Sequence, residues 1–142
     1  MDADLPAGAV AVAGWEPGLR LMTDNLVENA ARHGRNGDDG PVAIRVAVEP
    51  ASAGAGPRLL VDDDGPGVAE ADRDRIFEPF ARAGRVGGRP GSGLGLALVA
   101  QQARHHGADV EVTRSPLGGA RFVVAFPAPA SGPQSTSRTA RA

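Results

Sequence analysis

The stretch VDDDGPGV, residues 61–68, joins an apolar run to three consecutive carboxylates and a glycine-proline-glycine turn. Leu59, Leu60 and Val61 predict a strand that ends at the carboxylates. The turn could bind a divalent cation, although the spaced acids of an EF-hand loop are absent, or it could carry solvated charges. In a third interpretation, one buried carboxylate accepts a hydrogen bond from an exocyclic amine, and the glycines let the backbone approach a planar ring.

Regular hydrophobic patterns surround this stretch and predict the fold. Alternation at residues 42–48 indicates a half-buried strand that pairs with 59–61, while three- and four-residue steps indicate two helices. In chain order we expect an edge strand at 10–13, a helix at 18–34, strands at 42–48 and 59–61, a short helix at 70–76, a helix at 94–106 and strands at 110–112 and 122–126. This order predicts an α+β fold: a two-layer α/β sandwich with a mixed, mostly antiparallel sheet and helices on one face.

The 142 residues fit a single domain. Residues 1–9 have no periodic pattern, and we expect a flexible segment there. The domain proper is expected at 10–126, with a Gly- and Arg-rich mobile loop at 82–93 and a disordered tail at 127–142.

Composition excludes several classes of protein. There is no Cys, so disulfides and thiolate chemistry are impossible, and all 15 basic residues are Arg. Without Lys the chain cannot be a Walker-A NTPase, a eukaryotic-type protein kinase or a Schiff-base enzyme. A formal net charge of −2 argues against nucleic acid as a partner.

A polar stripe follows one face of the predicted helix at 18–34. Asn25, Asn29 and Arg32 are spaced four and three residues apart, which places them on the same face. Amide oxygens can ligate Mg²⁺, and a guanidinium can hold phosphate oxygens. The alternative is a solvated face on which Glu28 and Arg32 form an ion pair.

A glycine cluster, GSGLG at residues 91–95, precedes the second long helix. Backbone N–H groups at a helix start make an anion site, and small residues allow close approach. The spacing differs from Gly-x-Gly-x-x-Gly, which disfavours a dinucleotide-binding fold. A glycine cluster taken alone is more often a simple turn.

Taken together, these elements resemble the ATP-binding domain of bacterial histidine kinases. The matching boxes occur in the family's order and are LVENA at 26–30, VDDDGPGV at 61–68, IFEPF at 76–80, GSGLGLA at 91–97 and GGARF at 118–122. In the last box Ala120 stands where Thr is common. Residues 91–102 and 115–122 resemble most closely the PrrB-type group of actinobacterial sensor kinases.

The resemblance implies the Bergerat (GHKL) fold, with ATP and Mg²⁺ as cofactors. It implies that Asn29 ligates Mg²⁺ and that Asn25, one turn earlier, also belongs to the catalytic site. Arg32 stands where many members have a phosphate-binding Lys, and His33 stands at a position near the nucleotide.

On the adenine side, the resemblance implies that Asp63 accepts the adenine amine beside a turn formed by Gly65 and Gly67. Arg82 is expected to reach the phosphates, and Phe77 and Phe80 to pack the base of the lid. The remaining residues implied to bind nucleotide are Gly91, Ser92, Gly93, Leu94 and Gly95.

Three other functions compete with this interpretation. Gyrase- or chaperone-type ATPases of the superfamily have a Glu base where this chain has Asn25, so hydrolysis is disfavoured. Anti-sigma-factor serine kinases also usually keep that Glu. A nucleotide-binding pseudoenzyme that acts only as an interaction module is the third alternative, and the intact Asn29, Asp63 and glycines at 91–95 argue against it.

His33, His105 and His106 lack the acceptor motif of a histidine kinase. We therefore expect a catalytic domain, monomeric in isolation, that phosphorylates a His on a separate dimerisation domain and serves a response regulator indirectly. It would be the cytoplasmic part of a membrane-anchored receptor.

Overall fold

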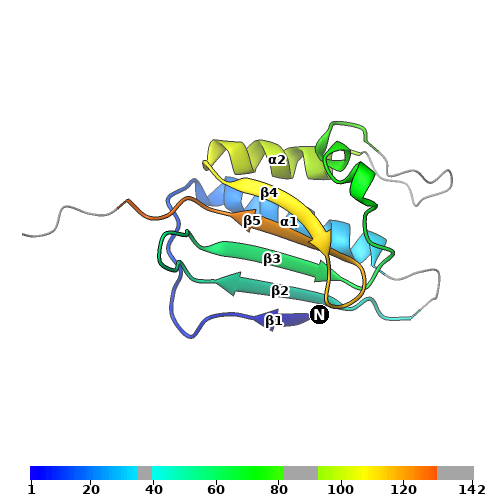
Figure 1. Cartoon of the computed structure of the whole chain (residues 1–142), viewed down its shortest axis with the longest axis horizontal. Helices are drawn as coiled ribbons and strands as arrows, with labels where there is room; N and C mark the ends of the chain where they lie inside the picture. The colour runs from blue at the N-terminus through cyan, green and yellow to red at the C-terminus, as the bar shows by residue number, and fades with distance from the viewer. Residues whose placement is uncertain (35–39, 82–92, 131–142) are drawn as a thin grey trace, which may run out of the picture.

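A five-stranded mixed sheet forms one layer of the protein (Figure 1). The computed structural model describes residues 1–34, 40–81 and 93–130. The strands follow the order β1-β2-β3-β5-β4, in which β1 and β2 are parallel and all other neighbours antiparallel. Their bounds are β1 Asp2–Asp4, β2 Ile44–Glu49, β3 Arg58–Asp63, β4 Asp109–Arg114 and β5 Ala120–Ala125.

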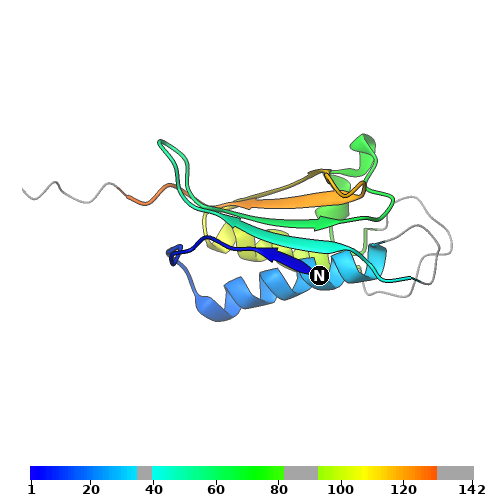
Figure 2. The same ribbon diagram turned by 90° about the horizontal axis from the view of Figure 1, so that it is seen from below.

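Two helices, α1 (Glu16–His33) and α2 (Gly95–His105), form the second layer, and Figure 2 shows both on the same face of the sheet. α1 buries Met22, Leu26 and Ala30, which recur every four residues on one stripe. α2 buries Val99 and Ala103 at the same spacing. The predicted two-layer α/β sandwich is confirmed.

Alternating residues of β3 and β5 divide the sheet into two faces. Val61 and Phe122, direct cross-strand partners, are buried beneath the helices, on what we call the inner face. Leu60 pairs across the strands with Ala47 and Val123, and these three form a small apolar cluster on the opposite, outer face. No helix of the described residues covers the outer face (Figure 2).

The edge strand predicted at 10–13 is wrong. Residues 10–13 form no strand, and the edge is β1, which lies in the 1–9 segment that we expected to be flexible. All three residues of β1 are exposed, and Asp4 pairs with Arg45 of β2 at 2.5 Å. An exposed edge strand is defined by its neighbour's hydrogen bonds, which a local apolar pattern does not encode.

The short helix predicted at 70–76 is two separate 3₁₀ turns, η1 (Glu70–Asp72) and η2 (Arg75–Phe77). Phe77 packs its ring edge-on against the core ring of Phe122, with centroids 6.3 Å apart. Phe80, in contrast, is 74% exposed.

The predicted mobile loop and the end of the predicted tail fall at 82–92 and 131–142, outside the described residues. Within the described part of the chain, no helix is long and apolar enough to cross a membrane.

A buried histidine joins the end of α2 to the start of α1. His106 Nε2 accepts a hydrogen bond from the Trp15 backbone N–H at 3.0 Å. This leaves the proton on Nδ1, which donates to the Gln102 carbonyl at 2.7 Å. The His106 ring is thus held by partners from both helices, whereas the side chain of Trp15 is largely exposed.

His106→Ala should destabilise the domain by about 1–3 kcal/mol, because it removes a buried ring and leaves the part-buried backbone N–H of Trp15 without its acceptor. The neighbouring His105 is exposed, so His105→Ala should change stability by less than about 0.5 kcal/mol. Urea unfolding of the two variants measures the difference. Equal effects would show that the ring does not join the helices.

Candidate nucleotide-binding site

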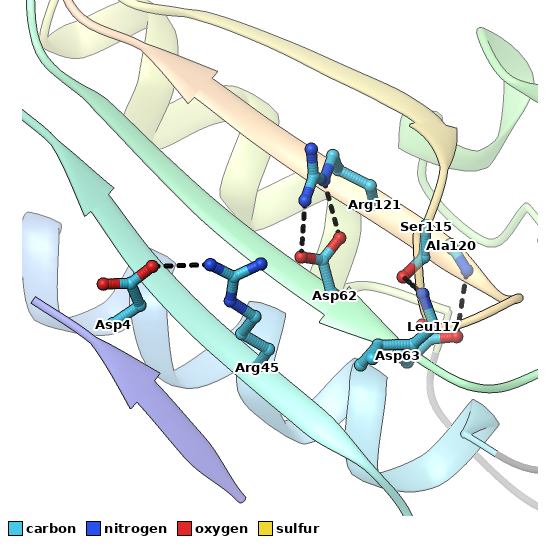
Figure 3. A network of polar contacts seen from close by, with 8 residues as sticks. All are labelled: Asp4, Arg45, Asp62, Asp63, Ser115, Leu117, Ala120 and Arg121. Carbon is cyan, nitrogen blue, oxygen red and sulfur yellow. Dashed lines mark hydrogen bonds and ion pairs between the residues drawn. The ribbon is translucent and has the colours of Figure 1, made fainter.

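The three consecutive carboxylates have three different environments. Strand alternation turns Asp62 to the outer face, where Arg121 binds it with two hydrogen bonds of 2.7 and 2.8 Å (Figure 3). Asp64 accepts a hydrogen bond from the Ala43 backbone N–H at 3.1 Å. Among the described residues, no three acidic, His or Cys side chains form a group that could hold a metal. A cation site on the three carboxylates is therefore wrong.

Asp63 is buried at the end of β3 and is oriented by backbone groups. Its Oδ1 accepts hydrogen bonds from the N–H of Gly65 at 2.9 Å and of Ala120 at 3.0 Å. Within the described residues, Oδ2 accepts no hydrogen bond and is not among the buried atoms that lack a partner. The carboxylate thus keeps one oriented oxygen for a donor from outside the chain.

Burial raises the pKa of Asp63, and the charge on Asp64 adds to this. The hydrogen bonds from Ala120 and Gly65, and the nearby His33, act in the opposite direction without cancelling it. For His33, burial of the ring and the charge on Arg32 lower the pKa, while Asp63 raises it. His33 is therefore neutral at physiological pH.

Two glycines allow the backbone to close around Asp63. A Cβ on Gly119 would collide with Asp63 Oδ1 and with the Gly65 nitrogen, and a Cβ on Gly65 would collide with the carbonyl oxygen of His33. Gly67 has a φ of +74°, a conformation that a side chain would strain. The DGPG turn, the start of β5 and the end of α1 therefore meet at one point.

Asn29 and Arg32 lie on the exposed side of α1. Asn29 is half-buried, and its amide forms no hydrogen bond within the described part of the chain. Arg32 donates to Glu28 at 2.5 Å, so the ion pair considered as an alternative is present. Both members of that pair are accessible to solvent, and such a pair contributes little stability. The guanidinium can leave Glu28 at small cost.

Asn25 brings α1 against the start of α2. Its Nδ2 donates to the Leu21 carbonyl at 2.8 Å, and its Oδ1 lies only 3.0 Å from where a Cβ on Gly95 would stand. Gly93, with a φ of +69°, accepts a hydrogen bond from the Phe80 N–H at 2.9 Å. Leu94 is the N-cap residue of α2, and the positive end of the helix dipole of α2 lies beside the polar stripe of α1.

The structure therefore places the predicted site residues in two groups. Asp63, Gly65, Gly67 and His33 surround the end of β3, while Asn25 meets Gly95 at the start of α2. Three other predicted residues, Arg82, Gly91 and Ser92, lie outside the described residues. Gly119 and Arg121 belong to the GGARF stretch but have no predicted site role, although the alternation of β3 indicates that Asp62 and Asp63 lie on opposite faces.

The fold and this site define a known class of protein. Residues 14–130 match the family described as histidine kinase-, DNA gyrase B-, and HSP90-like ATPase, and the chain belongs to that family.

Two relatives of this chain are sensor histidine kinases within that family. The sensor-type histidine kinase PrrB of Mycobacterium tuberculosis is 43% identical over 125 residues, which span 88% of this chain and 26% of that protein. The sensor histidine kinase CpxA of Escherichia coli is 36% identical over 126 residues, 87% of this chain and 26% of that protein. The chain thus spans about a quarter of the length of these relatives.

Solved structures agree with the fold. The crystal structure of the ATP-binding domain of PrrB from Mycobacterium tuberculosis matches with a TM-score of 0.67 and 38% identity, over 91% of this chain and 81% of that one. The mycobacterial sensor histidine kinase MprB matches with a TM-score of 0.72 and 28% identity, over 89% and 80%. The resemblance to PrrB-type kinases is confirmed.

Asp63→Asn should leave the ligand-free domain as stable as wild type, or more stable, at neutral pH, because it keeps an oxygen for both backbone N–H groups and removes a buried charge. The pKa of Asp63 is raised in the folded state, so wild-type stability is gained on acidification and lost as the pH rises through that pKa. The advantage of Asp63→Asn should therefore grow between about pH 4 and about pH 7 in urea unfolding experiments. An advantage that shrinks over this range would contradict the raised pKa.

Proposed function

We propose that this domain binds Mg²⁺-ATP and transfers the γ-phosphoryl group to a histidine on a separate dimerisation domain of a two-component sensor kinase. The observation that carries the proposal is the Asp63 carboxylate. It is buried, two backbone N–H groups fix one oxygen, and the other oxygen is left for a donor. Family membership and the PrrB and CpxA relatives support the same function.

Adenine recognition follows from this geometry. Oδ2 of Asp63 accepts a hydrogen bond from the exocyclic amine of the base, and a 6-oxo base would present an acceptor there instead. Gly65 and Gly67 leave room for a flat ring against the backbone. The raised pKa of Asp63 makes the donor's contribution larger, because a hydrogen bond to the carboxylate partly offsets the cost of burying its charge.

The phosphates would lie between α1 and the start of α2. Arg32 exchanges Glu28 for phosphate oxygens, and the positive end of the helix dipole of α2 favours negative charge. The uncommitted amide oxygen of Asn29 fits a Mg²⁺ ion that takes most of its ligands from phosphate and water. When bound, the ion would neutralise charge on the transferring phosphoryl group. Arg82, Gly91 and Ser92 are proposed to complete the phosphate side.

Transfer is favoured over hydrolysis by the residues around Asn29. The ATPases of the family use a base at the position of Asn25, whose amide here donates to the Leu21 carbonyl and cannot take a proton. Glu28 lies about 100° around the helix from Asn29, so its carboxylate is directed away from the position proposed for the metal ion. Among the residues that the structure describes on α1, water therefore has no positioned base, and a delivered imidazole needs none, because neutral His is itself the nucleophile.

We propose for the whole protein a membrane-anchored receptor whose cytoplasmic part includes this domain and passes phosphate to a response regulator. The relatives named as sensor kinases are about four times as long as the matched region. An ATPase or a serine kinase of the same superfamily remains the competing function, and the product of transfer distinguishes them.

ATP with Mg²⁺ should raise the melting temperature of the domain, since free nucleotide a hundredfold above Kd adds about 2.7 kcal/mol of stability. Asn29→Ala should remove the Mg²⁺-dependent part of this stabilisation and leave ATP binding without Mg²⁺ intact. Gln101→Ala, which removes an exposed amide from α2, is the matched control. Equal loss with and without Mg²⁺ would overturn the role of Asn29, and no shift in wild type would overturn nucleotide binding.

The chain alone should neither label itself nor release phosphate rapidly from radiolabelled ATP. Dimerisation helices of the cognate kinase, added as a separate chain, should acquire acid-labile phosphohistidine in a reaction that requires Mg²⁺ and Asn29. Acid-stable phosphoserine on an added protein would favour the serine kinase. Fast phosphate release by the domain alone would favour the ATPase.

A further inference from the structure

The outer face of the sheet carries a buried ion pair next to the site. Arg121 of β5 binds Asp62 of β3 with Nε to Oδ1 at 2.7 Å and a second nitrogen to Oδ2 at 2.8 Å. The Asp62 side chain is 1% exposed and that of Arg121 25% exposed. This parallel, two-bond geometry is the strongest form of an Arg–carboxylate contact.

Other cross-strand pairs on the same face differ in burial. Arg58 and Glu49 pair between β3 and β2, and both side chains are about half exposed. Arg45 and Asp4, which Figure 3 shows beside the buried pair, are likewise accessible. Among the ion pairs of the described residues, the one with Asp62 has the buried carboxylate, so its loss would take the hydrogen-bonded partner from a buried charge. Arg45, the cross-strand neighbour of Asp62 on β2, is already paired with Asp4.

The register ties this pair to Asp63. Asp62 and Arg121 are direct cross-strand partners. Their chain neighbours Asp63 and Ala120 form the contact in the site, in which the Ala120 N–H donates to Asp63 Oδ1. Two side-chain contacts therefore join the end of β3 to the start of β5, one on each face of the sheet (Figure 3), in addition to the backbone hydrogen bonds between the strands. A displacement of β5 that lengthens the first contact also lengthens the second.

Backbone hydrogen bonds also hold the start of β5, since the Gly119 N–H donates to the Asp63 carbonyl at 3.1 Å and the Gly119 carbonyl accepts from the Ser115 N–H at 2.8 Å. The turn that precedes β5 contains Gly118, which has a φ of +106° and no neighbour within 4 Å of a would-be Cβ. Gly119, the last residue of the turn, lies so close to Asp63 that a Cβ would collide with its carboxylate. Small shifts of this turn therefore change the environment of the carboxylate that we assign to adenine.

From these contacts we infer that Arg121 is a positioning residue for adenine recognition. It acts through Asp62 to hold the start of β5, so that Ala120 fixes one oxygen of Asp63 and leaves the other for the amine of the base. This inference rests on the proposed function, because it assigns a second residue to the same recognition event.

The test compares ATP with inosine triphosphate, which has a carbonyl oxygen in place of the adenine amine and a proton on N1, and which has the same sugar and phosphates. Isothermal titration of the whole chain gives the ratio of the two Kd values. Arg121→Met should lower the wild-type preference for ATP by about fivefold or more, towards the value for Asp63→Asn. Arg58→Met, which breaks the exposed pair on the same face, should keep the preference within about twofold of wild type.

A second variant separates positioning from folding. Arg121→Met leaves Asp62 buried and unpaired, so Asp62→Asn combined with Arg121→Gln supplies a neutral hydrogen-bonded pair without a buried charge. This double variant should recover thermal stability and much of the ATP preference. Nuclear magnetic resonance should show the Ala120 amide proton shifted upfield in Arg121→Met, as its hydrogen bond to Asp63 weakens, and unchanged in Arg58→Met.

Each outcome decides between the two proposals. If wild type binds neither nucleotide, the proposed function fails, and the inference fails with it. If wild type prefers ATP and Arg121→Met weakens both nucleotides equally, the pair is only structural and the inference is overturned. An unchanged ratio together with an unchanged Ala120 resonance overturns it as well.

Discussion

The close approach of the Asp63 carboxylate to the backbone of two glycine turns is the constraint on which the rest of the site depends. A carboxylate buried at the end of a strand needs donors, and here they are main-chain N–H groups, which can come close only where Gly65 and Gly119 have no side chain. The sheet register places Ala120 opposite, and the end of α1 closes the same point. The strand order places β5 beside Asp63, and the helix layer places the end of α1 against the same carboxylate.

Much of this arrangement could be predicted from the sequence. The alternation at 42–48 and the four-residue steps in the two helices show which side chains face the core. These patterns are therefore enough to predict the two-layer α/β sandwich. Asp63 was assigned through its place in the VDDDGPGV stretch, and the structure confirms that it is buried and oriented. Its assignment to adenine is still a prediction, as are the roles of Asn29 and Arg32.

Other features depend on contacts between distant residues and could not be read from local pattern. Asp62 and Arg121 are 59 positions apart, and only the register of β3 on β5 brings them together. The edge strand at Asp2–Asp4 buries no side chain, so no apolar alternation in the sequence indicates it. Trp15 resembles a core residue by type, but its place before the first turn of α1 leaves it in solvent.

The junction between α1 and α2 contains the residue that dominates the intrinsic fluorescence of the protein. Trp15 is the sole tryptophan and the chain has no tyrosine, so excitation of indole reports on one position alone. That position donates its backbone N–H to His106, while the start of α2 meets Asn25 at the other end of the same helix pair. Fluorescence emission from Trp15 therefore reports on the contact between the start of α1 and the end of α2. This contact lies at the end of α1 remote from Asp63, so no probe needs to be attached to the site.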